Sequence, residues 1–227
     1  MKKYITILLL MFSVFSYAGE KEFEISDFTK ITATGNFKIT LVKGTETKVT
    51  AINRDENIED DQLFAEVQGT ELVLKLMKDT YKVRKVEYIV YYKEVFELHA
   101  KRGAWFKSDD VFTNKSIDLN VDSGGGINIK IACNTVDVVL KNGGTVNLSG
   151  TSENANFSIN KGGNIAAYNL VSENSNSKVV FGGEILVKVT KKLFAVVKSG
   201  GTIKYKGGAT DVTEEIKLAG NIIKLDK

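Results

Sequence analysis

A glycine signal returns from residue 102 onward at an almost constant spacing, and it constrains the fold more than any other feature of this chain. Successive aligning glycines lie 22, 19, 19, 20, 18 and 19 residues apart. A period near 20 residues is typical of a solenoid, in which one coil cannot bury its apolar side chains alone. Aligned on the last glycine, the signals are Arg102-Gly103, Gly124-Gly125, Gly143-Gly144, Gly162-Gly163, Gly182-Gly183, Gly200-Gly201 and Ala219-Gly220.

Two columns of mostly apolar residues keep a fixed distance from these glycines. Two residues after each glycine stand Trp105, Ile127, Val146, Ile165, Ile185, Ile203 and Ile222. Four residues before it stand His99, Val121, Leu140, Ile159, Val179, Val197 and Ile216. Stacked parallel strands place equivalent residues about 4.8 Å apart, so each column predicts a continuous stack inside the coil. In this alignment the only histidine heads a core column as a buried, hydrogen-bonded residue.

The expected fold is therefore all-β, a right-handed parallel β-helix of coils about 19–20 residues long. The chain contains no proline, which agrees with a molecule made almost entirely of paired strands. Glycines are expected at the corners with positive φ, which costs other residues about 1 kcal/mol or more. The corner glycines are Gly103, Gly125, Gly144, Gly163, Gly183, Gly201 and Gly220.

The chain divides into three segments. Residues 1–18 have the layout of a secretory signal peptide, with Lys2 and Lys3 before an apolar stretch and Ala18 before Gly19. Residues 19–98 show alternating strands without the glycine period, over 37–42, 48–52, 72–76 and 86–92, with turn signals at 43–46 and 68–71 that suggest hairpins or a meander. Residues 99–227 form the glycine-repeat solenoid, continuous with the preceding region.

These segments place the chain outside the cytoplasm. The expected location is periplasmic, outer-membrane-associated or extracellular, with no membrane span in the mature chain. Loss of Lys2 and Lys3 lowers the net charge from +3 to +1. A nearly neutral surface gives no electrostatic reason to expect a nucleic-acid partner.

The opening of the mature chain carries a resemblance to a known family. Phe28-Thr29-Lys30-Ile31, the run Gly35-Asn36-Phe37-Lys38-Ile39-Thr40-Leu41 and the recurrent glycine coil resemble the family described as putative auto-transporter adhesin, head GIN domain. Gly126-Ile127-Asn128 even spells its name. The resemblance implies an exported, β-helical protein of bacterial envelopes. It transfers no catalytic residue and no cofactor.

Two positions are weak candidates for a metal site. Asp118 and Asp137 stand one coil apart in a column that continues as Asn156 and Asn176, so the two carboxylates could hold calcium and the amides a hydrogen-bonded ladder. Asp and Asn also favour positions near turns without any metal. Cys133 continues the alternating run of three isoleucines before it and is expected to be a buried apolar residue rather than a nucleophile.

The outward positions beside the corners form a flat polar strip that could bind a glycan or simply face water. Its members are Thr145, Asn147, Asn164, Thr202, Lys204 and Asn221. The sequence favours a non-enzymatic envelope or surface interaction module whose partner is an envelope or extracellular protein or a glycan, with a possible homo-oligomer through the final strand. The alternative is a calcium-dependent polysaccharide-active enzyme on a β-helix, although the cations near the Asp118/Asp137 pair are scattered.

Overall fold

The computed structural model describes residues 19–77, 83 and 85–226, and every regular element in them is a strand apart from one short 3-10 turn at Asp60–Gln62. The expected signal peptide lies outside these residues. All the strands belong to one 15-stranded sheet that curls on itself. They are β1 (Glu20–Phe23), β2 (Lys30–Thr34), β3 (Lys38–Lys43), β4 (Lys48–Asn53), β5 (Leu63–Gln68), β6 (Glu71–Leu76), β7 (Val86–Tyr92), β8 (Glu97–Lys101), β9 (Trp105–Phe112), β10 (Ser116–Asp122), β11 (Gly126–Asn142), β12 (Thr145–Lys161), β13 (Asn164–Phe181), β14 (Glu184–Lys206) and β15 (Asp211–Lys224).

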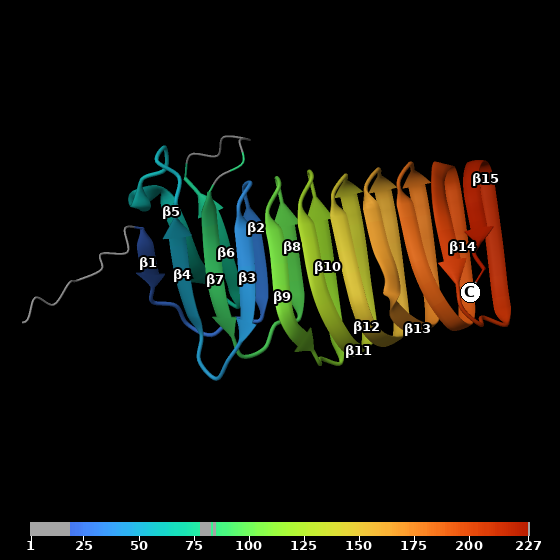
Figure 1. Cartoon of the computed structure of the whole chain (residues 1–227), viewed down its shortest axis with the longest axis horizontal. Helices are drawn as coiled ribbons and strands as arrows, with labels where there is room; N and C mark the ends of the chain where they lie inside the picture. The colour runs from blue at the N-terminus through green and yellow to red at the C-terminus, as the bar shows by residue number, and fades with distance from the viewer. Residues whose placement is uncertain (1–18, 78–82, 84, 227) are drawn as a thin grey trace, which may run out of the picture.

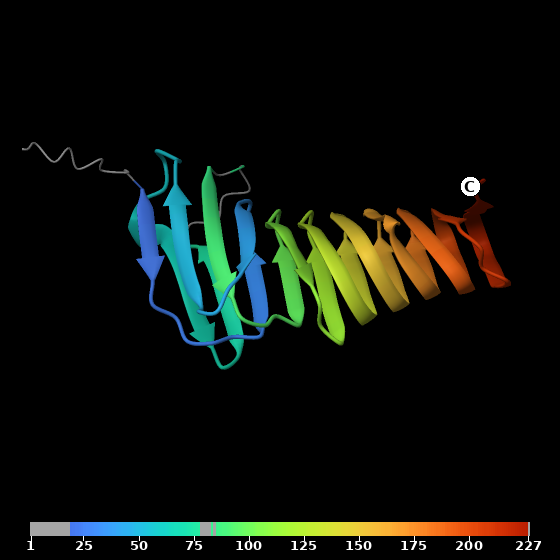
Figure 2. The same cartoon turned by 60° about the horizontal axis from the view of Figure 1, so that its bottom comes forward.

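The sheet folds into two layers that run the length of the molecule (Figures 1 and 2). Layer A contains β1, β4, β7, β3 and β9, and layer B contains β5, β6, β2, β8 and β10. Strands β11, β12 and β13 each contribute their first half to layer A and their second half to layer B, because β11 pairs with β9 over 126–131 and with β10 over 135–140. Strand β14 continues past the next corner into layer A again, and β15 begins in layer B and ends in layer A. The expected parallel β-solenoid is confirmed: neighbouring coils pair in parallel from β2 and β3 to β15.

Glycine pairs form the tight corner between one coil and the next. At the central corner Gly162 has φ +63° and open space where a Cβ would be, whereas Gly163 has φ +104° and no such space. A Cβ on Gly163 would lie 2.7 Å from Leu140 Cδ2 and 2.9 Å from the Gly144 carbonyl oxygen. That carbonyl accepts a hydrogen bond from the Asn164 amide at 3.0 Å, so the backbone ladder continues through the corner. The second glycine is therefore needed for close approach as well as for its φ.

The first two corners are built differently, and the sequence alignment is wrong there. Arg102 and Gly103 take positive φ at one, Ser123 and Gly124 at the next, while Gly125 does not. At both corners the second residue with positive φ comes one position earlier than it does in the later corners. Gly103 therefore corresponds to Gly124, and not to Gly125 as the sequence alignment assumed. The shift moves every residue of the first coil to the opposite side of its strand relative to the predicted alignment.

Two predicted core residues consequently face outward. Trp105 lies opposite Gly126 in the register, and its neighbour Phe106 fills the interior position opposite Ile127. His99 lies opposite Asn120 on the outer face of layer B, while Leu98 and Ala100 are fully buried beside it. Both errors come from the different turn at these two corners, because an alignment slip of one residue reverses the direction of a strand's side chains.

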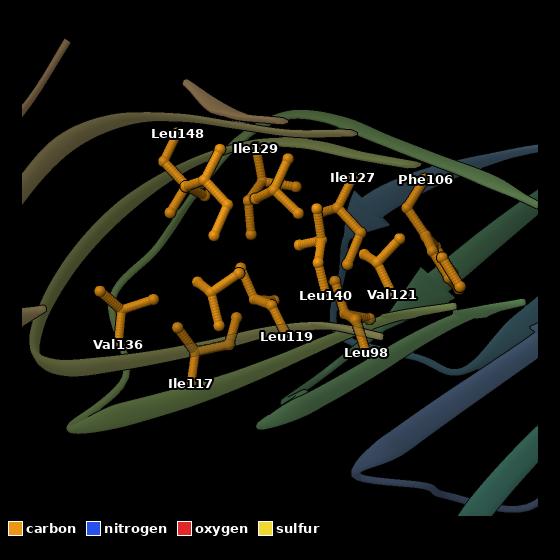
Figure 3. Packing of buried hydrophobic residues seen from close by; sticks show 14 of the residues in the cluster. Leu98, Phe106, Ile117, Leu119, Val121, Ile127, Ile129, Val136, Leu140 and Leu148 are labelled. Carbon is orange, nitrogen blue, oxygen red and sulfur yellow. The ribbon is translucent and has the colours of Figure 1, made fainter. Parts of the chain in front are cut away.

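The remaining columns are buried as predicted, except at the C-terminal end. Ile127, Val146, Ile165, Ile185 and Ile203 are each fully buried. Figure 3 shows how side chains of the two layers meet, with Ile127, Ile129 and Leu148 on one side and Ile117, Leu119 and Val136 on the other. In the last coil Ile222 is half-buried and Ile216 is 49% exposed, because no described strand other than β14 pairs with β15.

The N-terminal region departs from the predicted meander. The turn at 68–71 does join an antiparallel hairpin, β5 to β6. The turn at 43–46 does not, because β7 lies between β3 and β4 and pairs with β3 in parallel and with β4 antiparallel. The parallel coil therefore begins within residues 19–98, and antiparallel strands are added only at its outer end.

Candidate functional site

The outer face of layer A carries a shelf of short polar side chains. The term shelf is used for Gly126, Asn128, Thr145, Asn147 and Asn164, in three neighbouring strands. Gly126, Thr145 and Asn164 follow one another in register, and so do Asn128 and Asn147. The side chains of Asn128, Thr145, Asn147 and Asn164 are outward because the residues between them, such as Val146 and Ile165, are buried in the core. No aliphatic side chain larger than alanine interrupts this part of the face, so it is flat and rich in amides and hydroxyls.

Trp105 bounds the shelf on the N-terminal side. A Cβ on Gly126 would lie 2.1 Å from Trp105 Cε3 and 2.2 Å from Cζ3, so the indole covers the glycine Cα directly. The ring is half-buried on this outer face. Glycine at position 126 is what allows the indole to lie against the strand, since any larger residue would displace it. The arrangement presents one ring face of the only tryptophan beside the shelf.

Tyr168 bounds the shelf on the C-terminal side. The register between β12 and β13 shifts between Asn147 and Ser149, and that between β13 and β14 shifts after Ala167, so Tyr168 stands in a bulge. Lys206 Nζ lies 5.0 Å from the centroid of the Tyr168 ring. Burial raises the pKa of the tyrosine hydroxyl. A bulge commonly redirects the side chain of its extra residue, as the bulge here does for Tyr168.

Two polar atoms at this end of the shelf have unused hydrogen-bonding capacity. Asn164 Oδ1 and the Tyr168 hydroxyl are covered by neighbouring atoms and have no hydrogen-bond partner within the described residues. Buried polar groups of this kind are uncommon in folded proteins and call for an explanation. A rotation of either side chain toward a bound hydroxyl-rich molecule would satisfy them.

The predicted polar strip is thus brought together only in part. Thr145, Asn147 and Asn164 are neighbours. Thr202, Lys204 and Asn221 lie on the same face but are separated from them by the coil that carries Glu184 and Leu186. Lys204 Nζ forms an ion pair with Glu184 Oε1 at 2.7 Å. The sequence missed Trp105 because of the corner shift, and it gave no signal for Tyr168, whose direction depends on a bulge.

The outer face of layer B carries the two carboxylates considered for a metal. Asp118 lies opposite Asp137 in the register, and Glu97 lies opposite Asp118 on the other side. Burial, and then the negative charges of Asp137 and Glu97, raise the pKa of Asp118. The predicted amide ladder begins as expected, since Asn156 Nδ2 donates to Asp137 Oδ1 at 2.8 Å. Within the described residues, no group of three or more His, Cys, Asp and Glu side chains is arranged to hold a metal ion.

Glu97, which lies opposite Asp118 in the register, is in contact with two basic side chains. Lys30 Nζ lies 3.6 Å from Glu71 Oε2 and 3.7 Å from Glu97 Oε2, so it separates two acids of neighbouring coils. His99 Nε2 contacts Glu97 Oε1. Burial lowers the pKa of His99. The alternation of positive and negative side chains from coil to coil stabilises this outer face, and the His99 ring takes part in it through its contact with Glu97.

Cys133 lies at the second corner of the coil, where the long strands bend from layer A to layer B. It is half-buried against the core, less covered than predicted. Burial, and then the charge of Asp137, raise the pKa of the thiol to about 11, so it stays protonated near neutral pH. An open groove of about 710 Å³ follows this corner past Asn134, Ser152 and Glu153.

The motif Ser152-Glu153-Asn154 lies along the same corner and recurs as Ser172-Glu173-Asn174 in the next coil. Asn174 Nδ2 donates to Asn154 Oδ1 at 3.1 Å, and the buried hydroxyls of Ser152 and Ser172 are 3.1 Å apart. Asn134 does not join this ladder, because it donates to Glu153 Oε1 at 3.0 Å. These bonds run from coil to coil and account for the repeated Ser-Glu-Asn motif structurally.

Comparisons with known proteins give a family and a fold. The family described as "Putative auto-transporter adhesin, head GIN domain" matches residues 27–209. No curated protein matches the sequence. The search for membrane-spanning segments found none among the described helices, since no helix there is long and apolar enough.

Several solved structures share the fold over almost their whole length. A putative adhesin from Bacteroides fragilis is 24% identical, with a TM-score of 0.78 over 91% of this chain and 96% of that one. A putative adhesin from Parabacteroides merdae is 21% identical, with a TM-score of 0.71 over 92% and 96%. A protein from Parabacteroides distasonis described as a putative lipid binding protein is 22% identical, with a TM-score of 0.68 over 91% and 96%.

Proposed function

The chain belongs to the head GIN domain family of putative auto-transporter adhesins, and from this premise we propose that it is an exported, non-enzymatic surface module that binds a glycan on the shelf. The family description supports an adhesin-like role and a place at the cell surface. The single observation that favours the shelf as the binding surface is the flat ring of Trp105 beside amides and hydroxyls in register.

The chemistry of the shelf favours a glycan over a protein. A pyranose ring has a face of C–H groups that stacks on an aromatic ring, and hydroxyls that pair with amide side chains. Protein interfaces usually centre on apolar side chains, and the shelf has none between Trp105 and Tyr168. Asn128, Thr145 and Asn147 are uncharged, which favours a neutral glycan.

A glycan array tests the proposal. The mature chain, residues 19–227, should bind a defined group of neutral glycans, and Trp105→Ala should weaken that binding about tenfold or more. Phe181→Ala is the matched control, because Phe181 is an exposed aromatic residue of layer B, 57% accessible. Circular dichroism confirms that each variant is folded. Binding that survives Trp105→Ala unchanged, or binding to proteins alone, would reject the shelf as a glycan site.

The enzymatic alternative has its own test. If Asp118 and Asp137 held a catalytic calcium ion, the mature chain would cleave a polyuronate when calcium is added, and Asp137→Asn would abolish the cleavage. We expect no cleavage, because the only histidine contacts Glu97, whose carboxylate also pairs with Lys30, and Asp137 already accepts a hydrogen bond from Asn156.

Export is tested separately. Mass spectrometry of the protein from its native host should find an N-terminus at or near Gly19. Intact chain beginning at Met1 in the cytoplasm would remove the surface role.

A further inference from the structure

The C-terminal end of the solenoid leaves core side chains uncovered. β15 pairs with β14 along one edge, and no other described strand pairs with it. Its Val212, Ile216 and Leu218 are 36%, 49% and 82% exposed. Ile216 lies in register with the fully buried Val197, so it continues an interior column that has no further cover. An exposed, long and partly apolar edge strand is a surface that another strand can pair with.

The N-terminal end is closed by different means. Its outermost strand in layer A, β1, has four residues, of which Glu20, Lys21 and Glu22 are charged. Lys21 Nζ donates to the Asp60 carbonyl at 2.8 Å and fastens β1 to the 3-10 turn. Short, charged edge strands resist pairing. Head-to-tail stacking would therefore join two unlike ends, one of which is protected.

We propose that two copies of this chain pair through β15, antiparallel and about a two-fold axis. The segment 212–216 of layer B alternates in direction: Val212, Glu214 and Ile216 face the interior, and Thr213 and Glu215 face outward, as their register with β14 requires. The register shifts after Ile216, and Lys217 lies on the outward side because it forms an ion pair with Glu215. The cores of the two copies join only if the inward-facing residues of one β15 lie opposite the inward-facing residues of the other. The axis must then pass through a residue, so that positions at equal distance on either side of it are paired.

Charge selects among these registers. An axis through Glu214, Glu215 or Lys217 places that residue opposite its own copy, and like charges directly opposite each other are destabilising. An axis through Ile216 places the two Ile216 side chains together over the open core. It also places Glu215 of each copy opposite Lys217 of the other. These two residues already form an ion pair within one chain, at 3.3 Å, so both are oriented along the same outer face.

Glu214 limits the assembly to two copies. Its carboxylate is on the inward side of β15 and accepts a hydrogen bond from the Tyr205 hydroxyl at 2.7 Å. This hydrogen bond keeps the Glu214 carboxylate paired with Tyr205 of its own chain when a second copy covers the edge. An inward carboxylate also discourages continued stacking of apolar strands. Antiparallel pairing uses the free edge of both chains, so the symmetry is closed.

The dimer has a consequence for binding. An axis perpendicular to layer B is also perpendicular to layer A behind it, so the outer faces of layer A in both copies point the same way. If the shelf binds glycan as proposed above, the dimer presents two shelves to one surface, and the second contact becomes intramolecular.

Sedimentation velocity of the mature chain over the micromolar range tests the pairing without any glycan. Wild-type protein should form a dimer. Glu215→Lys and Lys217→Glu should each weaken it about tenfold or more, because symmetry turns two attractive contacts into two repulsive ones. The double variant should restore the dimer, since the pairs are then only exchanged. The control is the exchange of Lys93 and Asp27, an ion pair of the N-terminal region at 2.9 Å, which should leave the dimer unchanged.

Three results would overturn the proposal. Wild-type protein that stays monomeric throughout the range has no β15 interface. A dimer that tolerates both single charge reversals is held elsewhere. Open-ended oligomers would show that the pairing is not closed. Circular dichroism of each variant separates loss of pairing from loss of fold.

Discussion

At the residue scale, the two glycines of a corner are required for different physical reasons. The first of each pair needs only a left-handed backbone, and Arg102 and Ser123 show that other residues can adopt it, at φ 54° and 52°. In the regular corners the second glycine lies against the coil before it, as it does at Gly144, Gly163, Gly183, Gly201 and Gly220. The glycine period that identified the solenoid is therefore enforced mainly by the space available at one position of each pair.

This distinction predicts unequal costs at the central corner. Gly162→Ala should cost about 1 kcal/mol, the penalty of a left-handed alanine. Gly163→Ala should cost several times more, because its Cβ would lie 2.9 Å from the Gly144 carbonyl oxygen and 2.7 Å from Leu140 Cδ2. Urea unfolding of the two variants measures the difference. Equal losses of stability would mean that the corners of neighbouring coils are not in contact.

Two carboxylates of layer B should respond to pH in opposite directions. The pKa of Asp118 is raised, so the folded state binds the proton more tightly and this group costs stability as the pH rises through its pKa. Asp118→Asn should thus stabilise the protein at pH 7, by less than about 1 kcal/mol on an exposed face, and the gain should shrink towards pH 4.

Asp122 is the comparison of opposite sign. A hydrogen bond from Asn142 lowers the pKa of Asp122, so its contribution is present at neutral pH and is lost as the pH falls through that pKa. Asp122→Asn should destabilise the protein at pH 7 and have less effect in acid. Thermal unfolding between pH 4 and pH 7 measures both variants. Gains or losses that do not depend on pH would show that charge is not their cause.

At the scale of the strand, alternation decides which substitutions the coil tolerates. Ile165 is fully buried, and its column runs through the central coils. Ile165→Asp should unfold the solenoid, because an unpaired carboxylate in a dry core costs several kcal/mol. Asn147→Asp introduces the same carboxylate on the outer face of the preceding strand and should change stability by less than about 1 kcal/mol. Thermal unfolding that is unaltered in the first variant would mean that the register is wrong.

The sequence predicted the strands and corners well wherever the repeat was regular. From Ile127 to Ile203 the interior columns followed from spacing alone, because the register of parallel coils is set by one fixed period. The prediction failed at Trp105 and His99, where two corners have a different turn and the side chains reverse. Tyr168 was missed because a bulge, which leaves no periodic signal, determines its direction. Half of the predicted polar strip therefore lies together, and its aromatic boundaries came only from the structure.

At the scale of the whole molecule, the solenoid is a rigid support with one closed end, one open end and two unlike outer faces. The outer face of layer B is held together by polar contacts, in which Lys30 pairs with Glu97 and Asn156 donates a hydrogen bond to Asp137. Layer A instead offers uncharged amides between two aromatic rings. Since the stack holds these groups in register over many coils, ligand binding at the shelf requires little ordering of the backbone.

Fluorescence of Trp105 tests the central claim most directly, because it is the only tryptophan in the chain and it borders the shelf. The mature protein is titrated with a glycan selected by the array, and calorimetry measures the affinity independently. We expect a saturable change in emission that gives the same dissociation constant as calorimetry, and the loss of both signals in Asn147→Lys. Binding that calorimetry detects while the emission of Trp105 stays constant would place the ligand away from the shelf and contradict the account.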